Sequence, residues 1–152
     1  MDLLLGVFVA VIIFAFLFLS WVDYERDYKR EIEYNDKLII GYQVTDMLVD
    51  SEGFPKNWED NPDNISSLGL KGDFAELDDD KVNMFFNHLS QDNVSELFNI
   101  ERFSFNVVIK NTDGYALTST LGDTPSLEDY IINLRRYVIY DGQNATLDFK
   151  IW

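Results

Sequence analysis

The strongest constraint on this chain is an apolar run close to its N-terminus. The run covers Leu3–Val22, twenty residues without a charged side chain. An α-helix rises about 1.5 Å per residue, so a run of this length matches the hydrocarbon core of a bilayer, about 30 Å thick. Trp21 stands near the end of the run, where an aromatic side chain suits the lipid–water interface. We therefore predict a transmembrane helix over residues 1–22.

A cleaved secretory signal and a buried core helix are the two other interpretations of this run. A secretory signal has a basic segment before its apolar part and a small-residue cleavage site after it. Here only Asp2 lies between Met1 and the run, and no such site follows. A core helix carries polar residues on its solvent side, whereas this run is apolar on all sides. The run therefore fits a permanent membrane anchor better than either of these.

Residues 23–152 have the size of one domain, and their composition is acidic. The chain has 27 acidic and 12 basic side chains, with a formal net charge of -15. Such a surface cannot neutralise a phosphate backbone, so we expect no nucleic-acid partner. The sequence has no cysteine, which excludes disulfides and thiolate nucleophiles. Its 12 Phe, 8 Tyr and 3 Trp supply enough apolar area for a packed core.

Segment 23–51 is predicted to continue the membrane helix beyond the bilayer. Glu25 and Lys29 form a favourable i,i+4 pair, as do Glu33 and Lys37. Gly41 is predicted to be a soft point, at which the helix could bend or restart. Apolar residues recur through the segment at roughly helical spacing: Tyr24, Tyr28, Ile32, Leu38 or Ile39, Tyr42 and Leu48. We expect this amphipathic part to cover the apolar face of a sheet.

The loop after this helix is predicted to be anchored on the domain. Gly53 suits a helix C-cap and Pro55 cannot continue a helix. The loop anchors are Gly53, Phe54, Pro55 and Trp58, of which Trp58 is expected to pack on the core. Aspartates 78–80 come before an apolar-periodic segment, so one of them is expected to cap a helix that runs to about Ser90. A divalent-cation site at these aspartates is the alternative, although the EF-hand spacing is absent.

The second half of the domain changes to β-type patterning. A short helix is predicted over about 92–98, followed by four strands in two hairpins at 103–110, 115–120, 131–140 and 145–152. Turn residues separate the strands of each pair, at Asn111–Gly114 and at Asp141–Asn144. The last strand is expected to tie the C-terminal residue Trp152 into the sheet. The predicted fold is α+β, with a long N-terminal helix packed on a small antiparallel sheet of about four strands.

No motif in the sequence indicates catalysis. His88 is the only histidine, and we expect a structural or surface role for it. Arg135 and Arg136 point to opposite faces of a predicted strand, so we expect one to be solvated and the other to pair with an acid. Binding of an anionic ligand there is the alternative. We predict that the protein is not an enzyme, and we expect no cofactor and no metal.

The sequence gives opposing indications of which side of the membrane holds the domain. Basic residues follow the apolar run and none precedes it, which by the positive-inside rule places the domain in the cytoplasm. Three N-glycosylation acceptor sequences, at Asn64, Asn93 and Asn144, favour the outside of the cell instead. We expect the outward orientation, with these asparagines as glycosylation candidates.

The chain resembles archaeal type IV pilin-like surface proteins. The resemblance lies in the apolar helix that continues into an amphipathic one, in the segment 51–60 (SEGFPKNWED), and in a terminal hairpin with the run RRYVIYDG at 135–142 that ends in an apolar strand and Trp152. It implies an extracytoplasmic subunit anchored by its N-terminal helix, which packs with other pilin-like subunits into a homo- or hetero-oligomer. Gly6 and Ala10 form a small-xxx-small pair that permits close helix packing. We therefore predict a structural role in a filament or envelope complex, the alternative being a monomeric, membrane-anchored module that binds a protein or glycan.

Overall fold

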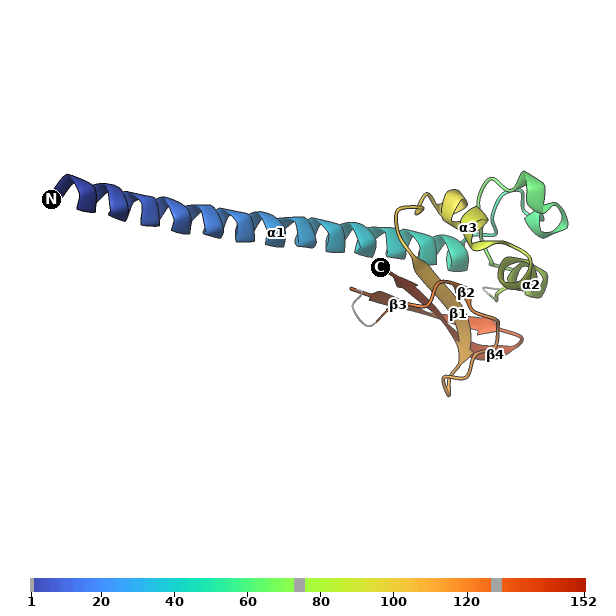
Figure 1. The fold of residues 1–152 in the computed structure, drawn as a ribbon. Helices are drawn as coiled ribbons and strands as arrows, with labels where there is room; N and C mark the ends of the chain where they lie inside the picture. The colour runs from blue at the N-terminus through green and yellow to red at the C-terminus, as the bar shows by residue number, and fades with distance from the viewer. Residues whose placement is uncertain (1, 73–75, 127–129) are drawn as a thin grey trace. The chain divides into compact units, whose positions relative to one another are not determined.

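The predicted α+β fold is confirmed by the computed structural model, which describes residues 2–72, 76–126 and 130–152 (Figure 1). A long N-terminal helix packs on a four-stranded antiparallel sheet. The chain divides into two compact units, residues 1–36 and 37–152. Its elements are α1 (Asp2–Asp50), the 3₁₀ turns η1 (Trp58–Asp60) and η2 (Pro62–Asn64), α2 (Asp79–Asn87), α3 (Gln91–Phe98), β1 (Phe105–Asn111), β2 (Leu121–Gly122), β3 (Ile132–Tyr140) and β4 (Gln143–Ile151).

The sheet has the order β2-β1-β4-β3, so the two hairpins are joined through a central β1–β4 pair. In that pair Val107 lies opposite Phe149 and Ile109 lies opposite Leu147. The β3–β4 hairpin closes through Asp141 and Gly142, which both have positive φ, as a two-residue turn with the strand twist requires. Ser104 and Trp152 exchange two backbone hydrogen bonds just beyond β1 and β4, which ties the last residue to the sheet.

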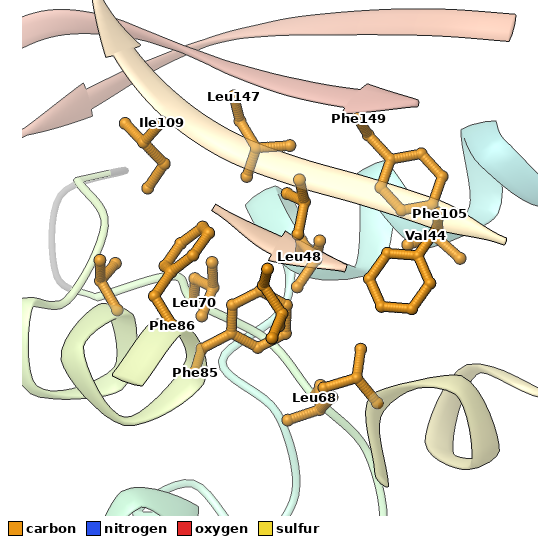
Figure 2. Close-up of a cluster of buried hydrophobic side chains, with 14 of the residues drawn as sticks. Val44, Leu48, Leu68, Leu70, Phe85, Phe86, Phe105, Ile109, Leu147 and Phe149 are labelled. Carbon is orange, nitrogen blue, oxygen red and sulfur yellow. The ribbon is translucent and has the colours of Figure 1, made fainter. Parts of the chain in front are cut away.

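The main core lies between one face of this sheet and the helices. Figure 2 shows Val44 and Leu48 of α1 beside Phe105 and Phe149 of the sheet. The last four turns of α1, within the unit 37–152, therefore cover the sheet, and α2 adds Phe85 and Phe86 to the same cluster. We call this covered side the inner face, and it comprises the even-numbered side chains of β3 and the odd-numbered ones of β1 and β4.

Side-chain caps start both short helices, and α2 ends at Asn87, three residues before the predicted end at Ser90. The Asp78 carboxylate accepts hydrogen bonds from the backbone N–H groups of Asp80 and Lys81, which makes it the N-cap of α2. The Ser90 hydroxyl accepts one from the Asn93 N–H at the start of α3. The aspartate that precedes α2 is thus a helix cap, as predicted.

The strand predicted over 115–120 is mostly irregular in the structure. Only Ala116 forms a bridge, to Lys110, and the regular partner strand β2 has just two residues, Leu121 and Gly122. Between them the Thr118 hydroxyl accepts the hydrogen bond of the Ile109 N–H, in place of a backbone carbonyl. A side-chain hydroxyl thus replaces a backbone acceptor of the sheet, and the alternation of apolar and polar residues in the sequence does not predict this.

The prediction for the outer half of α1 is confirmed only in part. Leu48 is buried, and Leu38 rather than its alternative Ile39 packs against the core. Ile39 and Tyr42 are exposed, whereas Lys37, Val44 and Thr45 are buried. The helix also passes through Gly41 without interruption. A Cβ at Gly41 would lie 2.4 Å from Leu134 Cδ1, so this glycine allows α1 to approach β3 closely.

Candidate functional site

The N-terminal part of α1 has the length and composition of a membrane span. Within the described residues it is the one helix that meets this test, with a mean hydropathy of 2.8 over its most apolar window and none of that window buried. Gly6 lies on this segment, and a Cβ built there meets no atom within 4 Å. Ala10 lies one turn further along, also exposed. Both small residues therefore leave room for another helix.

A stripe of large apolar side chains continues from this span along α1, within the unit that ends at Asp36. We call Trp21, Tyr24, Tyr28 and Ile32 the juxtamembrane stripe; their spacings of three and four residues place them on one side of the helix. All four are exposed, and the rings of Tyr24 and Tyr28 stack with their centroids 6.4 Å apart. The charged pair Glu25–Lys29 flanks the stripe, with 2.7 Å between its nitrogen and oxygen atoms. The helix is amphipathic here, and its apolar side, the juxtamembrane stripe, is exposed.

Of the two aromatic residues among the predicted loop anchors, one is buried and the other is exposed. Trp58 is fully buried, and its Nε1–H donates a 3.0 Å hydrogen bond to the carbonyl oxygen of Gly69. Gly53 has a φ of 78°, and a Cβ there would lie 2.6 Å from the Trp58 ring. Phe54 is exposed, and Pro55 follows it through a cis peptide bond. The Gly-Phe-Pro-x-Asn-Trp segment thus holds its tryptophan inside and displays its phenylalanine.

The three glycosylation candidates lie at exposed positions on three different elements. Asn64 ends η2, Asn93 lies in the first turn of α3, and Asn144 lies near the start of β4. The Ser or Thr at the third position of each acceptor sequence differs in exposure: Ser66 is exposed, whereas Ser95 and Thr146 are buried. In the folded domain, Asn64 therefore has the most accessible acceptor sequence.

Neither His88 nor the acidic groups of the described residues form a recognisable metal centre. His88 is exposed at the C-terminal end of α2. No group of three or more His, Asp or Glu side chains in the described ranges is arranged to hold a metal ion. A hollow of about 360 Å³ beside Gly72 is lined by four carboxylates, those of Glu76, Asp78, Asp79 and Asp141.

Asp79 has the most perturbed carboxyl group of this acidic hollow. Burial, together with the neighbouring charges of Asp141, Glu76, Asp78 and Asp80, raises the pKa of the Asp79 carboxyl above its ordinary value. Glu76 accepts a 2.6 Å hydrogen bond from the backbone N–H of Gly142. Two of the carboxylates, Asp78 and Glu76, therefore accept hydrogen bonds from a helix start and a turn, and all four concentrate negative charge on this part of the surface.

Lys81 is the buried cation of the domain's loop region. Its Nζ donates hydrogen bonds to the carbonyl oxygens of Glu52, at 2.9 Å, and Lys71, at 3.4 Å. These contacts join α2 to two loops. Lys81 also lines a second hollow, of about 300 Å³, together with Lys56 and Glu59. Lys81 thus acts as a structural tie between segments that are distant in sequence.

Both arginines of the adjacent pair form ion pairs, where the sequence predicted a partner for one of them. On the inner face, Arg136 pairs with Asp46 of α1 and lies 5.5 Å from the centre of the Tyr42 ring. On the opposite face, Arg135 donates from Nε and Nη2 to the Asp148 carboxylate, at 2.6 and 3.1 Å. Lys110 contacts the same carboxylate at 3.0 Å. The pair therefore stabilises the sheet on both sides.

Asp148 is the centre of this second cluster. Its side chain is only 2% exposed. Burial raises the pKa of its carboxyl, but the hydrogen bonds from Arg135 and Lys110 outweigh that effect, and the pKa lies below its ordinary value. The carboxylate is thus ionised and holds two cationic side chains next to each other on the sheet.

Comparisons with protein-family models, curated proteins and solved structures find no match to this chain.

Proposed function

We propose that the chain is a membrane-anchored, pilin-like cell-surface protein with a structural role in a filament or envelope complex. The observation that carries this proposal is the juxtamembrane stripe. Tyr24 and Tyr28 are 69% and 54% exposed, although they lie in continuous helix directly after the span. Contiguous exposed apolar surface is typical of interaction sites. Packing of this stripe against another α1 would bury it, while the apolar span is buried in lipid.

Helix packing of this kind is consistent with the small residues in the span. Gly6 and Ala10 have the spacing that permits close approach of two helices in a bilayer. The binding energy of such contacts is modest, but anchoring in one membrane confines the copies to two dimensions and raises their effective concentration. An assembly can therefore form from interfaces that are too weak for a soluble dimer.

Single cysteines provide a direct test, because the natural sequence has none. We would introduce Tyr24→Cys or Tyr28→Cys and oxidise intact membranes. The matched controls are Arg26→Cys and Arg30→Cys, which are two residues from the stripe and thus on the other side of the same helix. We expect disulfide-linked dimers at least about fivefold more abundant for the tyrosine positions, by the helical periodicity of contacts.

Equal cross-linking at all four positions, or none, would contradict the assembly proposal. A product that joins the chain to one different protein, without a homodimer, would favour the monomeric binding module instead.

We also propose that the domain lies outside the cell, where the three acceptor asparagines would be available for glycosylation. Thr112→Cys places a thiol in the exposed turn after β1. We expect a membrane-impermeant maleimide to label it on intact cells as strongly as after lysis. Labelling only after lysis would place the domain in the cytoplasm, as the positive-inside rule suggests.

A further inference from the structure

The sheet has a second face that no helix of the described residues covers. The register places Arg135, Asp148 and Val108 in one row across β3, β4 and β1, and Tyr137, Thr146 and Lys110 in the next. A third row contains Asn133, Lys150 and Asn106. These nine residues are here called the outer face. Its side chains alternate with those of the inner face, which point to the core.

The charge of the outer face is opposite to that of the whole chain. Its strand positions carry Lys110, Arg135 and Lys150 against a single acid, Asp148. The chain as a whole has more than twice as many acidic as basic side chains. Because Asp148 is ionised and buried beneath two of the cations, its role is that of an internal counterion. A net positive face is thus held in place on a strongly acidic protein.

The outer face also has the side chains that dominate protein interfaces. Tyr137 is 84% exposed, and about half of the Arg135 side chain is accessible. Tyrosine and arginine are enriched among the residues that contribute most to binding. The Arg135 guanidinium is already positioned by its two hydrogen bonds to Asp148, so little conformational entropy is lost when a partner docks.

We propose that the outer face docks on an acidic surface of a second copy of this chain. This inference rests on the proposed assembly and names a contact within it. Charge complementarity supports a second copy, since copies with a net charge of -15 repel one another unless a cationic patch meets an acidic surface. The two surfaces of such a contact differ, so it is heterologous and leaves the acidic surface of one copy and the outer face of the other available for further subunits.

Zero-length amine-to-carboxyl coupling on the full-length protein in membranes tests this contact. We would mix ¹⁴N- and ¹⁵N-labelled copies before the coupling, so that mass spectrometry identifies bonds between two copies. We expect mixed-isotope peptides that join Lys110 or Lys150 to exposed carboxylates, and a fall of about tenfold in these products on going from low salt to 0.5 M salt, because a Debye length of a few ångströms screens the attraction.

Lys150→Glu is the informative variant, because it reverses one charge of the outer face and leaves the Asp148 ion pairs in place. The matched control is Lys56→Glu, which makes the same charge change at an exposed side chain elsewhere. We expect the yield of Lys110 cross-links to fall at least about fivefold for Lys150→Glu and to stay unchanged for Lys56→Glu. Equal effects of the two variants, or mixed-isotope products that never include the outer face, would overturn the proposal.

The result of the amine-to-carboxyl coupling can be distinguished from the result of the cysteine cross-linking of α1. Cross-linking through Tyr28→Cys without mixed-isotope products from the outer face would support assembly through α1 and refute this contact. Coupling of the outer face only to a different protein or to an acidic glycan would also refute it, since the proposed occupant is a second copy.

Discussion

Asp148 is a buried counterion that holds two cationic side chains together on one face of the sheet. Its carboxylate is nearly inaccessible and receives hydrogen bonds from Arg135 and Lys110, two side chains that come from the neighbouring strands on either side. Charge-assisted hydrogen bonds of this kind are shorter and stronger than neutral ones. Without this carboxylate the two cations would repel each other. Asp148 therefore links its strand to both neighbouring strands and positions two cations of the outer face.

We predict that Asp148→Asn destabilises the domain in a pH-dependent way. The folded-state pKa is lowered, so the stabilisation is fully present above the unfolded pKa of about 4 and is lost as the pH falls through the folded pKa. At pH 7 we expect a loss of about 1–3 kcal/mol, and a smaller difference from wild type at acidic pH. Urea unfolding of the full chain in detergent micelles, followed by near-ultraviolet circular dichroism, measures both values.

The control for this prediction is Asp113→Asn in the exposed turn after β1. Its unfolding free energy should match that of wild type within about 0.5 kcal/mol at either pH. A difference between Asp148→Asn and wild type that stays constant as the pH is lowered would show that the ion pairs do not account for its effect.

At the scale of elements, α1 carries two different surfaces along one helix. Its last turns bury Val44 and Leu48 against the sheet, whereas Tyr24 and Tyr28 are exposed. The sequence shows one continuing apolar stripe, which we expected to face the sheet throughout. In the unit 37–152 the last turns of α1 do so: Gly41 lets the helix approach β3 closely, and Asp46 pairs with Arg136 of β3.

We predict that truncations on the two sides of α1 differ sharply in cost. Leu48→Ala removes a fully buried side chain and should lower the free energy of unfolding by about 2–5 kcal/mol, through lost transfer energy and a cavity. Ile39→Ala, at an exposed position of the same helix, should change it by about 0.5 kcal/mol or less. Similar losses in the two variants would mean that α1 packs on the sheet through a different face.

At the scale of the whole molecule, the chain has an apolar span and an acidic domain, and the continuous helix α1 belongs to both. The span contains no charge, and the domain has its own core of aromatic and aliphatic residues from helices and sheet. Each part is therefore stable in a different solvent, the first in lipid and the second in water. This division is compatible with membrane anchoring through the N-terminal helix.

We predict that charges in the span release the protein from membranes. Each lysine at the centre of a transmembrane helix costs about 2.5–3.5 kcal/mol, so Phe14→Lys with Leu17→Lys should move the chain from the pellet to the supernatant after alkaline carbonate extraction. The control, Tyr34→Lys with Ile39→Lys, adds the same charge outside the span and should stay in the pellet. Retention of the first variant in the pellet would show that the span is not what anchors the chain.

The sequence by itself determined the features that depend on neighbouring residues. The apolar run indicates a membrane helix because lipid selects composition rather than tertiary contacts. The cap at Asp78 and the turn at Asp141–Gly142 follow from hydrogen bonds and φ angles within a few residues. These signals need no knowledge of the rest of the fold.

Only the tertiary structure decided how distant segments pair. The sheet order places β4 between β1 and β3, and this order brings Asp148 between Lys110 and Arg135. The same packing chooses the buried side of α1, gives Arg136 its acidic partner, and leaves 115–120 irregular. Strand order and helix rotation depend on how whole faces fit together, so no local pattern of residues could fix them.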